Sequence, residues 1–128
     1  MTTPISAMMT ACVETVGMED FVAQVETAMS AHQLSSMPVV DDAGRIFGII
    51  SAADVMHFHA LKRNPKAVHA WEICTHKAIM VDMDASARDV AALMAQNHIH
   101  HVVITDAGTI KGIVSSLDFV RQFLMEAE

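Results

Sequence analysis

The sequence predicts a mixed α/β (α+β) fold made of two similar halves, each with the element order β-α-β-β-α. The first observation is an internal repeat, because DDAGRIFGIISAAD at residues 41–54 returns as TDAGTIKGIVSSLD at residues 105–118. A repeat at a fixed spacing indicates a duplicated architecture. The second observation is a hydrophobic period that alternates between strand and helix spacing in the same order in both halves. Since 52% of the 128 residues are hydrophobic, the two halves can share a real core.

Each half opens with a short strand and continues into an amphipathic helix. The β-branched segments CVETV (12–16) and AIMVDM (78–83) are the predicted strands. Apolar residues then recur at helical spacing over residues 19–32 in the first half and over residues 86–97 in the second.

A hairpin and a second helix complete each half. In the first half an Asp-Ala-Gly turn joins MPVVD to RIFGIIS, and in the second half HVVIT and TIKGIVS repeat the pattern. A helix is predicted after each Ser-x-x-Asp. Pro65 stops the helix of the first half, so a linker follows it. We therefore expect one repeat at residues 5–62, a linker at 63–69 and a second repeat at 70–126.

Composition and missing motifs argue against several classes of protein. A formal net charge of −7 disfavours broad nucleic-acid binding, which needs a basic face. Cys12 and Cys74 lack the Cys-x-x-Cys spacing, which fits free thiols in a reducing cytoplasm. We find no leader pattern and no apolar run of about 18 residues, so we expect a cytoplasmic protein without a membrane partner. No nucleophile elbow, Gly-rich Lys loop or dinucleotide fingerprint points to an enzyme.

The duplicated pattern resembles a tandem pair of CBS domains, a Bateman module. The resemblance is carried by Met9-Thr10 near the start, by MPVVDDAGRIFGIISAAD, and by the second copy in register with both. It implies two halves packed sheet to sheet about a pseudo-twofold axis, with clefts that hold an adenosine-containing ligand such as AMP, ADP, ATP or S-adenosylmethionine. It further implies a non-catalytic regulatory homodimer that has no obligatory cofactor and acts on a separate protein.

Each Ser-x-x-Asp admits two interpretations. Ser51 with Asp54, and Ser115 with Asp118, stand where a strand ends and a helix begins. There the hydroxyl can cap a free backbone N–H and the carboxylate can complement the helix dipole, which together stabilise the fold by about 1 kcal/mol. The same helix N-terminus can also receive an anion. The resemblance implies that the serine contacts phosphate and the aspartate contacts ribose, and both interpretations can hold together.

Gly48 and Gly112 interrupt two predicted strands. A glycine in a strand usually marks a bulge or a close backbone approach. Tight packing between the halves explains both residues better than ligand contact does.

The two copies differ before their third strand, where the first has Ser35 and Ser36 and the second has His100 and His101. Neither copy offers an arginine at these positions for bidentate phosphate contact. An unperturbed histidine titrates near pH ~6.5, so nucleotide affinity is expected to rise from pH ~8 to pH ~6. The resemblance implies a stronger site comprising Thr10, Val13, Leu34, Ser35, His100, His101, Ile113, Ser115 and Asp118. It implies a weaker site comprising Ser35, Ser36, Ile49, Ser51, Asp54, Thr75, Ala78, Ile99 and His100.

Two other functions stay open. Eight histidines raise the question of a metal site, and His98, His100 and His101 come closest to a ligand cluster, yet no Cys or carboxylate neighbours them in sequence. We therefore expect no native metal. A ligand-free dimeric scaffold is the other alternative, since the closing helix carries a broad apolar stripe with Phe123 and Leu124.

Overall fold

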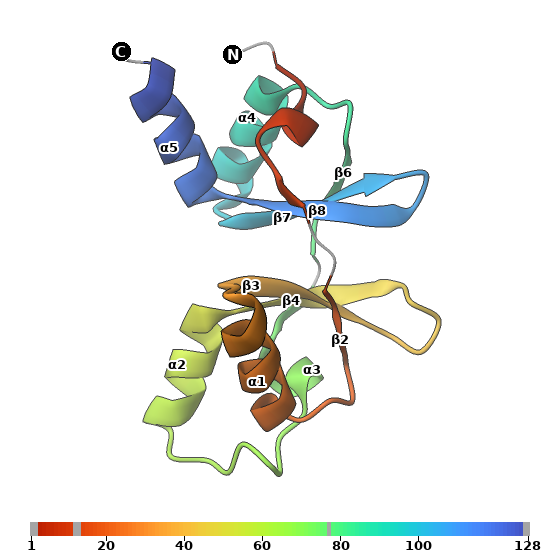
Figure 1. Ribbon diagram of the computed structural model, residues 1–128, viewed down its shortest axis with the longest axis vertical. Helices are drawn as coiled ribbons and strands as arrows, with labels where there is room; N and C mark the ends of the chain where they lie inside the picture. Colours follow the sequence, from red (N-terminus) through yellow and green to blue (C-terminus); the bar gives the residue numbers. More distant parts are fainter. Residues whose placement is uncertain (1–2, 12–13, 77, 127–128) are drawn as a thin grey trace. The chain divides into compact units, whose positions relative to one another are not determined.

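The computed structural model describes residues 3–11, 14–76 and 78–126, and the chain forms two compact units. One unit comprises Glu14–Ala78, and the other combines Met1–Val13 with Ile79–Glu128 (Figure 1). We call them the 14–78 unit and the 79–128 unit. Each contains a four-stranded sheet, which confirms the predicted mixed α/β fold with two repeats.

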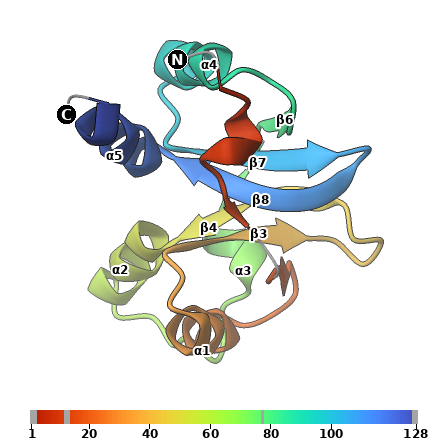
Figure 2. The same cartoon turned by 45° about the horizontal axis from the view of Figure 1, so that its top comes forward.

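The 14–78 unit has the sheet order β2-β3-β4-β5, in which β2 runs parallel to β3 and the other neighbours are antiparallel. Its helices lie on one face of this sheet (Figure 2). Val25, Met29, Met37 and Ile50 belong to the buried cluster between the two layers. The strands are β2 (Val16–Gly17), β3 (Ser36–Val40), β4 (Ile46–Ser51) and β5 (Thr75–His76), and the helices are α1 (Val22–His32), α2 (Ala52–Ala60) and α3 (Ala70–Ile73).

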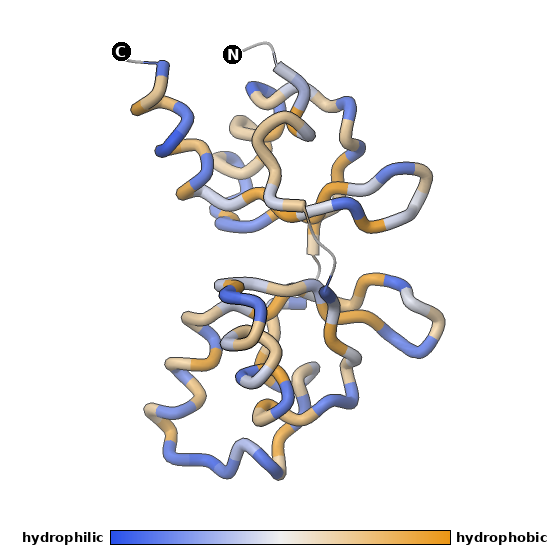
Figure 3. Tube along the Cα trace, viewed as in Figure 1, coloured by the Kyte–Doolittle hydropathy of each residue, from blue (hydrophilic) through white to orange (hydrophobic). Residues whose placement is uncertain are grey.

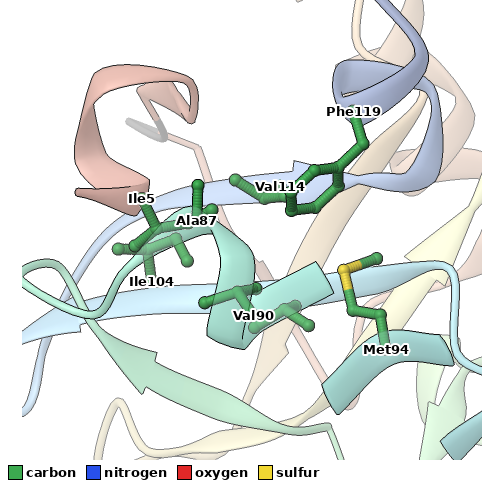
Figure 4. Packing of buried hydrophobic residues seen from close by; sticks show 8 residues of the cluster. Ile5, Ala87, Val90, Met94, Ile104, Val114 and Phe119 are labelled. Carbon is green, nitrogen blue, oxygen red and sulfur yellow. The ribbon is translucent and has the colours of Figure 1, made fainter. Parts of the chain in front are cut away.

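The 79–128 unit repeats this plan with the sheet order β1-β8-β7-β6, and β6 runs parallel to β7. Helices α4 and α5 cover one face of the sheet (Figures 1 and 2). Figure 4 shows apolar side chains of the buried cluster between these helices and the sheet, including Val90, Met94, Ile104 and Phe119. The elements are η1 (Ile5–Ala7), β1 (Thr10–Ala11), β6 (Met80–Asp82), α4 (Ala87–Asn97), β7 (His101–Asp106), β8 (Thr109–Ser115) and α5 (Ser116–Glu126).

The two units exchange short strands relative to the sequence repeat. Strand β1 of the first repeat pairs with β8, so that Thr10 stands opposite Ile113. Strand β5 of the second repeat pairs with β4, so that Thr75 stands opposite Ile49. The compact units therefore divide the chain at other points than the sequence repeat does.

Local chemistry explains where several elements begin. The predicted helix over residues 19–32 begins only at Val22, because Gly17 donates its amide to Asp20 Oδ2 at 2.8 Å in a turn ahead of it. In the first hairpin, Asp41 Oδ1 accepts the amides of Ala43 and Arg45, each at 2.9 Å. The resulting turn is mostly hydrophilic in Figure 3, between apolar strands.

The segment expected as a linker packs within the 14–78 unit, and the first predicted strand is described only in part. Val68, inside residues 63–69, is 3% exposed and packs with Val22 and Phe58, so this segment belongs to the 14–78 unit. Part of the predicted strand at 12–16 lies outside the described residues, and within the described part only Val16 is extended as a strand. No helix among the described residues is long and apolar enough to cross a membrane.

Candidate functional site

Both Ser-x-x-Asp motifs form the same capping arrangement. Asp54 Oδ2 accepts the amide of Ser51 at 2.8 Å and its hydroxyl at 3.0 Å, while Ser51 Oγ accepts the amide of Asp54 at 3.3 Å. Ser115 and Asp118 reproduce these hydrogen bonds at 2.8, 3.1 and 3.3 Å. The predicted N-caps are therefore confirmed. In each carboxylate the capping uses Oδ2, which leaves Oδ1 for other partners.

In the 79–128 unit, strand alternation places four predicted site residues on one sheet face. Val102, Ile104 and Val114 point toward α4 and α5 and join the buried cluster. Because neighbouring side chains in a strand point to opposite faces, the alternate set stands on the face away from the helices, which we call the helix-free face. That set includes His101, Val103, Ile113 and Ser115, with Thr10 opposite Ile113 on β1. Asp118 lies at the end of this row, in the first turn of α5.

The 14–78 unit shows the same arrangement. Met37 and Ile50 point into the core beneath the helices. The alternate side chains of β3 and β4 therefore stand on the helix-free face, where Ser36 pairs with Ser51 and Ile49 pairs with Thr75. The structure thus brings together Ser36, Ile49, Ser51, Asp54 and Thr75 within one unit.

His100 and Ser35 lie just before β7 and β3, and the backbone carbonyl of each accepts a hydrogen bond from the first residue of a helix. The carbonyl of His100 accepts the amide of Ser116 at 3.0 Å, and the carbonyl of Ser35 accepts the amide of Ala52 at 2.8 Å. His100 Nδ1 also lies 3.2 Å from Ser116 Oγ. A ligand role of either side chain stays a prediction.

The His100 imidazole lines a cavity of about 340 Å³ between α4 and α5. Ile99 lines the same cavity and packs against the core of the 79–128 unit. Leu34 packs against the core of the 14–78 unit. Ala78 is half-buried. Val13 lies outside the described residues.

Gly48 lies in β4 and Gly112 in β8, where these strands pair with the exchanged strands β5 and β1. A Cβ on Gly112 would lie 2.5 Å from the carbonyl oxygen of Thr10, and a Cβ on Gly48 would collide with the carbonyl oxygen of Thr75. The predicted close approach is confirmed, and its partner is in each case a backbone segment from the other sequence repeat.

Cys74 is buried beside the Ser51–Asp54 site. Burial, followed by the negative charge of Asp54, raises the pKa of its thiol to about 11, against the opposing effect of a backbone hydrogen bond. The thiol is therefore protonated and weakly nucleophilic at neutral pH.

Sequence reasoning missed one charged residue. Arg121 Nη1 lies 3.8 Å from Asp118 Oδ1, one helical turn beyond it. The i, i+3 spacing on a predicted helix was the signal that could have found this pair. Within the described ranges no three His, Cys, Asp or Glu side chains gather closely enough to hold a metal ion.

The duplicated unit, with one capped Ser-x-x-Asp at the end of each helix-free face, defines a tandem-repeat α/β module. The CBS-domain family model matches residues 5–60 and 70–124, so the chain belongs to the CBS-domain family.

Known relatives extend this assignment. The chain is 26% identical over 132 residues to the uncharacterized protein MJ1404 of Methanocaldococcus jannaschii, covering 93% of this chain but only 31% of that relative's length. It is 27% identical over 114 residues to the uncharacterized protein YlbB of Bacillus subtilis, covering 88% of this chain and 77% of YlbB. Among solved structures, the CBS domain pair of protein MJ0100 in complex with 5-methylthioadenosine and S-adenosyl-L-methionine superposes with a TM-score of 0.82 at 26% identity, covering 98% of this chain and 99% of that one.

Proposed function

We propose that this protein is a non-catalytic regulatory module that binds an adenosine-containing ligand at its CBS repeats and signals to a separate partner protein. The candidate ligands are AMP, ADP, ATP and S-adenosylmethionine. The observation that carries the proposal is the repeated placement of a capped Ser-x-x-Asp at the end of a helix-free sheet face. The adenosyl ligands of the MJ0100 domain pair support it.

The chemistry of each site suits a nucleoside. In both aspartates Oδ1 lies outside the capping hydrogen bonds, so it can accept hydrogen bonds from ribose hydroxyls. The amides in the first turn of α2 or α5 can receive a phosphate, since a helix N-terminus favours anions. Ile49 and Ile113 are the apolar residues next to the two motifs on these faces, but they are only 5% and 6% exposed, so an adenine ring would contact them only at their edges. In this proposal Ser115 and Asp118, with His101 nearby, form the stronger site.

Regulation requires that ligand favours one arrangement of the protein over another, since a ligand shifts an equilibrium only by its differential affinity. We propose a homodimer formed through α5 as the route to the partner. Five apolar side chains of α5 are 50% to 72% exposed in the chain: Leu117, Val120, Phe123, Leu124 and Met125. Figure 3 shows hydrophobic and hydrophilic stretches alternating along this helix.

The exposed face of α5 also favours the second candidate function, an assembly scaffold that binds no ligand. Thermal unfolding with and without AMP, ATP, S-adenosylmethionine and 5-methylthioadenosine separates the two. A ligand at 100 times its dissociation constant stabilises the folded state by about 2.7 kcal/mol, which raises the melting temperature measurably. We expect such a rise with at least one of these compounds. No rise with any of them would leave the scaffold as the function.

A further inference from the structure

The two aspartates of the proposed sites share one capping geometry but have different electrostatic surroundings. Asp118 has Arg121 Nη1 at 3.8 Å from its Oδ1. Its side chain is 14% exposed, whereas that of Arg121 is 67% exposed. Side chains on a helix lean toward its N-terminus. The guanidinium of Arg121 consequently extends back over the first turn of α5, where Ser115 and Asp118 lie.

The first repeat lacks this cation. The residue three positions after Asp54 is His57, which is exposed. Among the residues that the structure describes, no lysine or arginine lies within ion-pair distance of Asp54. The negative charge of Asp54 instead acts on Cys74, where it helps to raise the pKa of the thiol.

This difference has a direct consequence for a bound ligand. A phosphate placed at the first turn of α5 would meet a guanidinium with five N–H donors in a planar fork, and Arg121 would offset the repulsion from the Asp118 carboxylate. A phosphate placed at the first turn of α2 would meet the Asp54 carboxylate without an arginine. An uncharged or cationic adenosyl compound avoids that repulsion.

Building on the adenosyl sites proposed above, we infer that Arg121 determines which ligand charge is preferred at the Ser115–Asp118 site. It makes this site select an adenosine ligand that bears a phosphate. The Ser51–Asp54 site, which has no counterpart of Arg121, takes an adenosyl compound without phosphate, such as a thioether or a sulfonium. Arg121 is thus a specificity-determining residue, and the two sites of one chain sort ligands by charge.

Calorimetric titration of the full chain with AMP and with adenosine tests this inference. We expect Arg121→Gln to weaken AMP binding about tenfold, the scale of one lost hydrogen bond to a charged group, and to leave adenosine binding unchanged. Arg121→Lys should retain part of the AMP affinity because it keeps the charge. His57→Gln, the matched change in the first repeat, should alter neither titration. Raising the salt concentration should weaken AMP binding less in Arg121→Gln than in the wild type.

Three results would overturn the inference. One is unchanged AMP affinity in Arg121→Gln, and another is an equal loss of AMP and adenosine affinity, which would assign Arg121 to the fold or to ribose. The third is a wild type that binds neither compound and is not stabilised by S-adenosylmethionine, which would also end the proposed function. The first two leave that function intact. Because Arg121 is mostly exposed, its variants should fold, and an unchanged circular dichroism spectrum checks this.

Discussion

At the scale of single residues, Gly48 and Gly112 illustrate what a pattern can and cannot establish. A glycine within a strand predicts a close backbone approach, and the structure supplies the partner as a carbonyl group of β5 or β1. The sequence could not name those partners, because Thr75 and Thr10 lie in the opposite repeat. Substitution at these glycines is therefore a test of strand exchange.

We predict that Gly112→Ala lowers the free energy of unfolding by about 1–3 kcal/mol, the usual cost of overpacking. The new Cβ would lie 2.5 Å from the Thr10 carbonyl oxygen and 2.8 Å from Met9 Sδ, and relief would require β1 to leave β8. Urea unfolding measures the change. Gly17→Ala is the control, since its Cβ would meet the Asp20 carboxylate at an ordinary 3.5 Å. Equal stabilities of the two variants would contradict the close packing.

The two aspartates allow capping to be separated from binding. Because Asp54 and Asp118 make matching hydrogen bonds, alanine at either residue should cost a similar stability, about 1 kcal/mol. If the Asp118 site is the stronger one, Asp118→Ala should weaken AMP binding more than Asp54→Ala. Urea unfolding and calorimetry on the same two variants give both quantities. Equal losses of affinity would remove the asymmetry between the sites.

At the scale of elements, the sequence predicts what local periodicity encodes and misses what distant pairing creates. Helices α1 and α4 and both hairpins were predicted because apolar spacing and turn residues define them within a few residues. Strands β1 and β5 have two residues each and show no period, and their ladders come from β8 and β4 far along the chain. For the same reason Thr10 and Thr75 needed the family resemblance to enter a site at all, and the ion pair of Arg121 was overlooked.

Helix α5 carries the prediction at this scale. Phe123 is 57% exposed and Leu124 is 66% exposed, so neither supports the core of its own unit. The double variant Phe123→Ser, Leu124→Ser should therefore keep the fold and shift the protein from dimer to monomer in light scattering. Leu61→Ser, at a residue that is 56% exposed just after α2, serves as the control and should stay dimeric. A dimer that survives the double change would place the interface elsewhere.

At the scale of the whole molecule, duplication and strand exchange make the sequence repeat differ from the folding unit. The fragment 1–62 contains the first repeat but lacks α3 and β5. Ala70 of α3 and Cys74, which lies between α3 and β5, are 0% and 8% exposed and belong to the core that includes Val25 and Met29. Val68, which closes the smaller cluster with Phe58, is also missing from that fragment. The fragment 14–78 keeps all of these groups and the complete sheet.

Fragments of nearly equal length should therefore behave differently. We predict that 14–78 unfolds cooperatively in urea, whereas 1–62 shows a broad transition or none, because its core is open and the β4 edge next to Gly48 is unpaired. Chains of about 60 residues are marginal in any case, so the comparison between the two is the measurement, followed by far-ultraviolet circular dichroism at 10 °C. A fragment 1–62 as cooperative as 14–78 would show that β5 and α3 add little. The folding unit would then coincide with the sequence repeat. The close approach of the β5 backbone would no longer explain why residue 48 is a glycine.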